Sequence, residues 1–187
     1  MDRREAVQYI SLLLGGTLVG ANAFLTGCKS DDAKDAKTFD ADDIAYLNEI
    51  GETILPATAT PGAKAANVGQ FMTVMINDCY EEKDQKTFRE GMKKLNDSAN
   101  KKFDNGFMKL SPTQRHELLV GLDKEQKEAM KIKKEGEPAH YFRMMKELTL
   151  LGYFTSEVGV KQARRHVPVP GRYDGCIPYK KGDKAFS

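Results

Sequence analysis

The spacing of apolar residues constrains this chain most, because they recur three or four positions apart and never alternate over a strand-length run. This spacing places them on one face of a helix, whereas a half-buried strand needs strict alternation. A long example in the middle of the chain comprises Phe88, Met92, Leu95, Ala99 and Phe103. We therefore predict an all-α protein, in which residues 39–187 form a small helical bundle followed by an extended Pro/Gly-rich C-terminal arm.

Several helix boundaries can be predicted from single residues. Asp40 is suited to cap a helix that continues to Leu55 and stops at Pro56. Ser111 followed by Pro112 has the pattern of a cap and a first helical position. Residues 141–154 are apolar around almost the whole circumference, so we predict that this helix is the central, buried one.

The C-terminal arm begins at about residue 167, where the composition changes. Residues 167–179 contain three Pro and two Gly, a composition that excludes a helix. Arg and Tyr are favoured at protein interfaces. We therefore take five residues in and before the arm as candidate partner contacts: Arg164, Arg165, Arg172, Tyr173 and Tyr179. The alternative is that the arm wraps over the protein's own core.

The first 27 residues have the order of features found in an export signal. Arg3 and Arg4 precede an apolar stretch at residues 10–25, which is short for a membrane-spanning helix. The Arg pair resembles a twin-arginine signal, with general secretion as the alternative. The sequence Leu-Thr-Gly-Cys at residues 25–28 resembles a lipobox, in which Cys28 is lipidated. An ordinary N-terminal helix with a buried Cys is the competing interpretation.

If residues 1–27 are removed, the mature protein begins at Cys28 with a polar, charged segment. Residues 28–38 carry no large apolar side chain, so we expect a flexible tether. This interpretation places the protein on the periplasmic side of a Gram-negative membrane, held by a lipid anchor. Acidic residues close to Cys28 leave cell-surface exposure as an alternative.

The three cysteines fit the same interpretation. With Cys28 lipidated, Cys79 and Cys176 remain as a pair in an oxidising compartment, and we expect a disulfide between them. It would close a loop of roughly 100 residues, worth about 4–5 kcal/mol in the chain-entropy model. The alternative is two unpaired, buried thiols.

Motifs that would indicate chemistry in this chain are absent from the sequence. It contains no Cys-x-x-Cys, no Gly-x-Gly-x-x-Gly and no Gly-x-Ser-x-Gly. His116 is expected at the surface, His140 in a capping or packing role, and His166 near the arm, none with metal-ligand spacing. The net charge of +2 does not favour nucleic acid as a partner. We therefore assign no catalytic, cofactor-binding or metal-binding residue.

Two segments resemble the gluconate 2-dehydrogenase subunit 3 family. The first, residues 47–63, has a helix ending in Ile-Leu-Pro followed by a Pro-Gly-Ala loop. The second contains Gly-Tyr-Phe-Thr-Ser-Glu at residues 152–157 and a Pro-Gly-x-Tyr-x-Gly pattern at residues 170–175. The resemblance extends over about residues 40–179, although residues 81–137 add little to it.

The resemblance implies a non-catalytic small subunit that accompanies a large flavin-dependent dehydrogenase of the glucose–methanol–choline type. Such complexes oxidise sugars, sugar acids or glycosides and pass electrons to a cytochrome c or another acceptor. FAD is expected in the partner and not in this chain. The leader would then carry the folded, flavin-loaded partner across the membrane. The alternative function is an independent lipid-anchored periplasmic binding protein.

Overall fold

The computed structural model describes residues 39–169, 171–172 and 175–186. The predicted leader at residues 1–27, with Arg3 and Arg4, lies outside these residues, as do Cys28 and the predicted tether. Within the described residues, the chain forms four longer helices and one of 12 residues: α2 (Ala41–Ile54), α3 (Val68–Cys79), α4 (Glu82–Phe103), α5 (Pro112–Ile132) and α6 (Tyr141–Thr155). No strand interrupts them in this part of the chain, which confirms the all-α prediction.

Short polar side chains start the helices where the sequence predicted. Asp40 accepts a hydrogen bond from the Asp43 amide at 2.8 Å, and Asp43 caps the Asp40 amide in return. Ser111 forms the same reciprocal pair with Gln114 at the start of α5. These bonds satisfy amide groups that the first helical turn leaves without partners. The predicted boundaries at Asp40 and Ser111 are therefore confirmed.

Short 3₁₀ turns connect the helices. They are η2 (Ala63–Ala66), before α3, and η3 (Phe107–Lys109), between α4 and α5. Asn67 and Asp104 adopt left-handed backbone angles, with φ of 54° and 53°, at the end of η2 and of α4. Asn and Asp tolerate this conformation better than other non-glycine residues, which explains both chain reversals.

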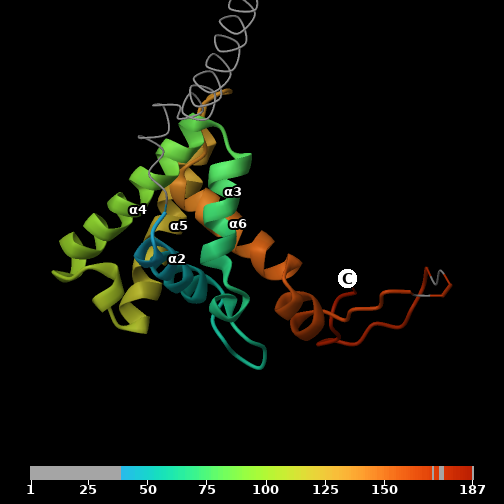
Figure 1. Cartoon of the computed structure of the whole chain (residues 1–187). Helices are drawn as coiled ribbons and strands as arrows, with labels where there is room; N and C mark the ends of the chain where they lie inside the picture. The colour runs from blue at the N-terminus through green and yellow to red at the C-terminus, as the bar shows by residue number, and fades with distance from the viewer. Residues whose placement is uncertain (1–38, 170, 173–174, 187) are drawn as a thin grey trace, which may run out of the picture. The chain divides into compact units, whose positions relative to one another are not determined.

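Helix α6 lies at the centre of the bundle and packs against α2, α3, α4 and α5 (Figure 1). Eight of its 15 residues are buried: Tyr141, Phe142, Met144, Met145, Leu148, Thr149, Gly152 and Tyr153. The core continues through Phe88 and Leu95 of α4, which are fully buried. The prediction of a central helix over residues 141–154 is therefore confirmed, because each neighbouring helix buries part of its surface on α6.

Although the sequence of α6 is apolar around almost its whole circumference, one side of the helix is not covered by the bundle. Leu150 is 37% exposed and Leu151 is 46% exposed. Both lie on the face that also carries Arg143 and Glu147, which form an ion pair. Residues four and seven positions apart share a helix face, so this polar pair marks the side of α6 that the bundle leaves uncovered.

The chain changes character after α6. A π-helical turn, η4 (Gly159–Ala163), follows, and the described residues from Arg164 onward form no helix. Their one regular contact is an isolated bridge between Arg165 and Phe186. None of the described helices is both long and apolar enough to cross a bilayer.

Candidate functional site

The two sequence segments that carry the resemblance meet at one end of the bundle. Tyr153, in the late segment, donates a hydrogen bond from its hydroxyl to the carbonyl oxygen of Pro61, in the early loop, at 2.6 Å. Tyr153 is almost fully buried. Phe71 of α3 lies against Gly152, where a Cβ would come within 2.6 Å of its ring. Tyr153 and Pro61, one from each of the two segments, therefore hold the α2–α3 loop against the C-terminal half of α6.

Two carboxylates of α2 organise the same loop. Glu52 accepts hydrogen bonds from the amides of Ala57 and Lys64, both at 2.9 Å. Glu49 pairs with the side chains of Lys64 and Arg115, the latter at 2.6 Å. The hydrogen bond from Lys64, followed by the positive charges of Lys64 and Arg115, lowers the pKa of Glu49 against the effect of its burial. Both carboxylates are bonded to groups of the loop or of α5, so they stabilise the conformation of the loop.

Gly159 turns the chain at the end of α6. A Cβ at this position would lie 1.9 Å from the carbonyl oxygen of Tyr153, a distance that no side chain can occupy. Ser156 accepts a hydrogen bond from the Gly159 amide at 3.0 Å and donates to the Tyr153 carbonyl at 2.7 Å. The turn therefore fixes where η4, and the basic residues after it, leave the bundle.

The predicted partner-contact residues fall into three groups. Arg164 stacks on Phe154 of α6, with its guanidinium carbon 4.7 Å from the ring centre, and Arg165 stacks on Phe186 at 4.8 Å. Tyr179 is 76% exposed, and Arg172 is also exposed. Tyr173 lies outside the described residues. The structure thus brings Arg164 and Arg165 together beside α6 and leaves their outer surface accessible.

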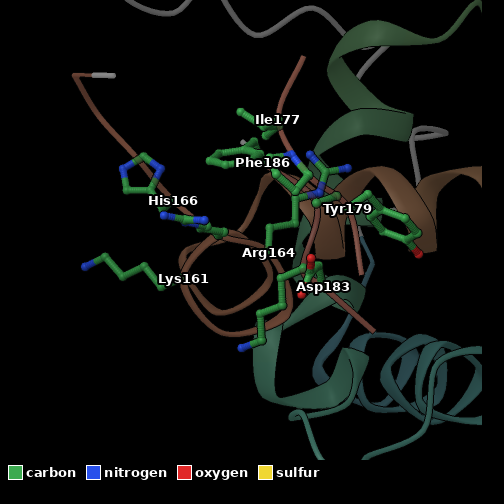
Figure 2. A pocket seen from close by; sticks show the side chains of 11 residues that line it. Lys161, Arg164, His166, Ile177, Tyr179, Asp183 and Phe186 are labelled. Carbon is green, nitrogen blue, oxygen red and sulfur yellow. The ribbon is translucent and has the colours of Figure 1, made fainter. Parts of the chain in front are cut away.

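These arginines line a pocket of about 1050 Å³ between η4 and the last residues of the chain (Figure 2). Its walls include Lys161, Arg164, Arg165, His166 and Lys184, with Asp183 as the acidic member. Lys161 pairs with Glu157, and Lys184 donates to the Gln162 carbonyl. In the part of the chain that the structure describes, Arg164 and Arg165 form no ion pair. The pocket is therefore a basic surface whose arginine charges are not neutralised within these residues.

The described end of the arm, residues 177–179 and 183–186, meets Lys161 of η4 and the residues after it in the basic pocket. No described apolar residue after Ala163 belongs to the core cluster or packs against it, and Arg164 stacks on Phe154 at its edge. The chain instead returns to η4, where the Arg165 amide donates to the Ala185 carbonyl at 2.8 Å.

The predicted disulfide is not formed in the structure. Cys79, the last residue of α3, and Cys176, in the arm, are both free and exposed. The expected alternative of buried thiols also differs from the structure, because neither side chain is covered. The backbone hydrogen bond that the end of the arm forms is to the residue after η4, from the Arg165 amide to the Ala185 carbonyl.

The three histidines belong to three different parts of the chain: α5, the start of α6 and the segment after η4. His116 is exposed on α5, and His140 caps α6 by accepting from the Phe142 amide through Nδ1 at 3.3 Å. Burial lowers the pKa of His140, although Glu125, 3.7 Å away, acts in the opposite direction. No group of three or more metal-ligating side chains occurs among the described residues. The capping role predicted for His140 and the surface position predicted for His116 are confirmed.

Sequence reasoning missed the exposed apolar residues of α3 and α6. Val74 is 47% exposed on the outer side of α3, in addition to Leu150 and Leu151 of α6. Their helical spacing resembles that of core residues, so the apolar pattern alone did not separate them from the core. For Leu150 and Leu151, the signal that could have found them is the charged pair Arg143 and Glu147, which lies on the same side of α6 and indicates that this side faces solvent.

A family model matches most of this chain. The model of the family described as gluconate 2-dehydrogenase subunit 3 matches residues 41–171, which is well over half of the chain and includes every described helix. Searches of curated proteins and of solved structures gave no match.

Proposed function

The chain belongs to the gluconate 2-dehydrogenase subunit 3 family, and on that premise we propose that it is the non-catalytic small subunit of a membrane-associated, flavin-dependent dehydrogenase complex. Its partner in this proposal is a large dehydrogenase subunit of the glucose–methanol–choline type that oxidises sugars, sugar acids or glycosides. A cytochrome c or another acceptor would take the electrons. The observation that carries the proposal is the family match across the whole helical bundle.

The roles of the residues in the two segments that resemble the family support a binding rather than a chemical function. Tyr153 is used to hold Pro61, and Glu49 and Glu52 are used to hold the loop that contains Pro61. These bonds make one end of the bundle rigid, and a rigid surface loses less conformational entropy when it binds a partner. We place FAD in the large subunit, because the sequence of this chain has no dinucleotide fingerprint.

We further propose that residues 1–27 are a twin-arginine leader and that Cys28 is the lipid-modified first residue of the mature protein. The twin-arginine route exports folded proteins, so the small subunit would carry its flavin-loaded partner with it. The complex would then lie on the periplasmic side of the membrane. Changing Arg3 and Arg4 to Lys should leave both subunits in the cytoplasm, whereas normal export of both would contradict the twin-arginine route.

Isolation of the tagged protein from membranes of its own cells tests the function. We expect a large flavoprotein in stoichiometric amount, recognised by its visible flavin spectrum and identified as a dehydrogenase by mass spectrometry. A colourless protein that is stable alone, and that retains no large subunit under mild detergent conditions, would contradict the proposal. That result would favour an independent lipid-anchored binding protein.

A further inference from the structure

Five apolar side chains of the packed helices α3 and α6 are exposed or only half-buried. Val74, Leu150 and Leu151 are between 37% and 47% exposed, and Phe71 and Phe154 are half-buried beside them. We call Phe71, Val74, Leu150, Leu151 and Phe154 the α3–α6 ridge. Scattered apolar side chains are normal on a surface, but a cluster on two packed helices marks a binding surface more often than chance.

Contacts within the bundle hold the ridge in one place. Phe71 lies against Gly152, which joins α3 to α6. Val74 is one turn along α3 from Phe71, and Leu151 is the sequence neighbour of Gly152. Leu150, Leu151 and Phe154 share one face of α6. The ridge therefore belongs to the rigid bundle and does not depend on the arm for its position.

A basic border adjoins the ridge at Phe154. The guanidinium group of Arg164 stacks on the Phe154 ring at 4.7 Å, so the apolar surface continues directly into the basic pocket of Figure 2. Residues 161–187 contain seven Lys and Arg against two Asp, whereas the rest of the chain contains 22 basic and 25 acidic residues. The excess of Lys and Arg over Asp and Glu therefore belongs to the segment that follows α6, and Arg164 of that segment lies at Phe154.

We propose that the α3–α6 ridge and its basic border, Lys161, Arg164, Arg165 and Lys184, form the surface that binds the large dehydrogenase subunit. The matching face of that subunit would be an apolar patch edged by carboxylates. This proposal rests on the proposed function, and the basic border of this chain fits an occupant that supplies carboxylates. An apolar centre with a charged edge is the usual anatomy of a protein–protein interface, and arginines held by aromatic rings are frequent energetic anchors there.

The charge pattern argues against a second copy of this chain as the occupant. In a two-fold symmetric dimer the same surface faces itself. Arg164 and Arg165 of one copy would then approach basic residues of the other, with Asp183 as the acidic group described in the pocket. Like charges opposed across an interface are unfavourable, so a partner that supplies carboxylates fits better.

The test uses the full-length tagged protein, isolated from membranes with its flavoprotein under the conditions given above. One variant carries Leu150→Glu with Leu151→Glu, and a second carries Arg164→Glu with Arg165→Glu. Matched controls place the same changes on α5 and the loop after it: Val120→Glu with Ile132→Glu, and Lys133→Glu with Lys134→Glu. Circular dichroism of each isolated variant checks that the bundle is folded, which we expect because all four leucine and arginine positions are at least partly exposed.

We expect the amount of flavoprotein retained by the leucine variant to fall by a factor of about ten or more relative to the unmodified chain. The arginine variant should lose roughly as much at low salt, because its charges become repulsive toward carboxylates, and the loss should depend on ionic strength. Both α5 controls should retain the flavoprotein at the unmodified level.

Several outcomes would overturn the proposal, and they are distinguishable from failure of the proposed function. If the unmodified chain retains no flavoprotein, the function itself is wrong and the docking surface is lost with it. If it retains flavoprotein and the folded leucine variant retains the same amount, the function stands and the ridge is not the binding surface. If the leucine variant captures flavoprotein normally but no longer self-associates, the ridge binds a second copy of the chain. If it captures flavoprotein normally but no longer binds anionic phospholipid vesicles, the ridge binds the membrane.

Discussion

The five-helix bundle and the segment after it, residues 156–186, are held together in different ways. The bundle buries large apolar side chains such as Phe88, Phe142 and Leu148 around α6. The later segment is held by one cation–π contact within itself, Arg165 on Phe186, by another that joins Arg164 to Phe154 of α6, and by a few hydrogen bonds. Of its apolar residues, Val158 and Ala163 pack against the core. The difference teaches that stability resides in the bundle, whereas the segment supplies charge and exposed surface.

Because stability resides in the bundle, we expect the largest change in the free energy of unfolding at Gly69 in α3. A Cβ at this position would lie 2.4 Å from the carbonyl oxygen of Ile44, so α2 and α3 would have to move apart. The shift would also weaken the 2.8 Å hydrogen bond from the Gly69 amide to Asn48. We expect Gly69→Ala to lower the free energy of unfolding by about 3 kcal/mol, measured by denaturant titration.

Gly121 of α5 is the matched control, because a Cβ there would have no neighbour within 4 Å. Gly121→Ala should raise the free energy of unfolding by about 0.5–1 kcal/mol through helix propensity alone. An equal loss at both glycines would contradict the close packing of α2 on α3.

The second largest effect is expected at Tyr153, which joins α6 to the early loop. Tyr153→Phe removes the hydroxyl and leaves the Pro61 carbonyl without its donor. We expect a loss of about 1–2 kcal/mol in the free energy of unfolding. Tyr179→Phe, in the exposed segment, should cause no change by the same measurement, and the comparison would break if both variants behaved alike.

A smaller, pH-dependent effect is expected at Asp123, which joins α5 to α6. Hydrogen bonds from Lys127 and then Lys146 lower the pKa of Asp123 from 3.8 to about 2. Because this pKa is lower in the folded protein, the stabilisation is present above about pH 4 and is lost as the pH falls toward 2. We expect Asp123→Asn to lower stability by less than about 1 kcal/mol at neutral pH and by nothing near pH 2.

Denaturant titrations over this pH range check the prediction at Asp123. Glu157→Gln, in the fully exposed pair with Lys161 after α6, should leave unfolding unchanged at every pH. A pH-independent loss in the Asp123 variant would show that packing, and not the charge, is responsible.

The smallest effect is expected in the segment itself. Phe186 is 51% exposed and contacts Arg165 through its ring. Phe186→Ala should change the free energy of unfolding of the bundle by less than about 0.5 kcal/mol. A loss as large as that of Tyr153→Phe would show that the segment is part of the cooperative unit and would break the comparison.

Local signals in the sequence were sufficient to predict much of the bundle. Asp40, Ser111 and His140 mark helix starts, because capping depends on a few neighbouring residues, and the Phe88–Phe103 pattern predicts a buried face directly. Tertiary relationships were not predictable in the same way. Leu150 and Leu151 have the helical spacing of core residues, and only the packing of the other helices decides which side of α6 stays uncovered.

The candidate site was predictable in part. Arg164 and Arg165 were selected from their residue types, and the structure places both beside α6 in one basic pocket. The joining of Pro61 to Tyr153 was not predictable, because it depends on how α2 and α6 pack. The expected pairing of Cys79 with Cys176 rested on counting cysteines, which carries no information on the distance between them.

Amide hydrogen exchange of the chain, alone and in its flavoprotein complex, tests the central claim most directly. It reports which amides the large subunit protects, without any mutation. We predict slower exchange in the complex over residues 150–166 and around Val74, with no change over the outer face of α4. Protection confined to α4 and α5, or no difference between the free and bound chain, would contradict the account.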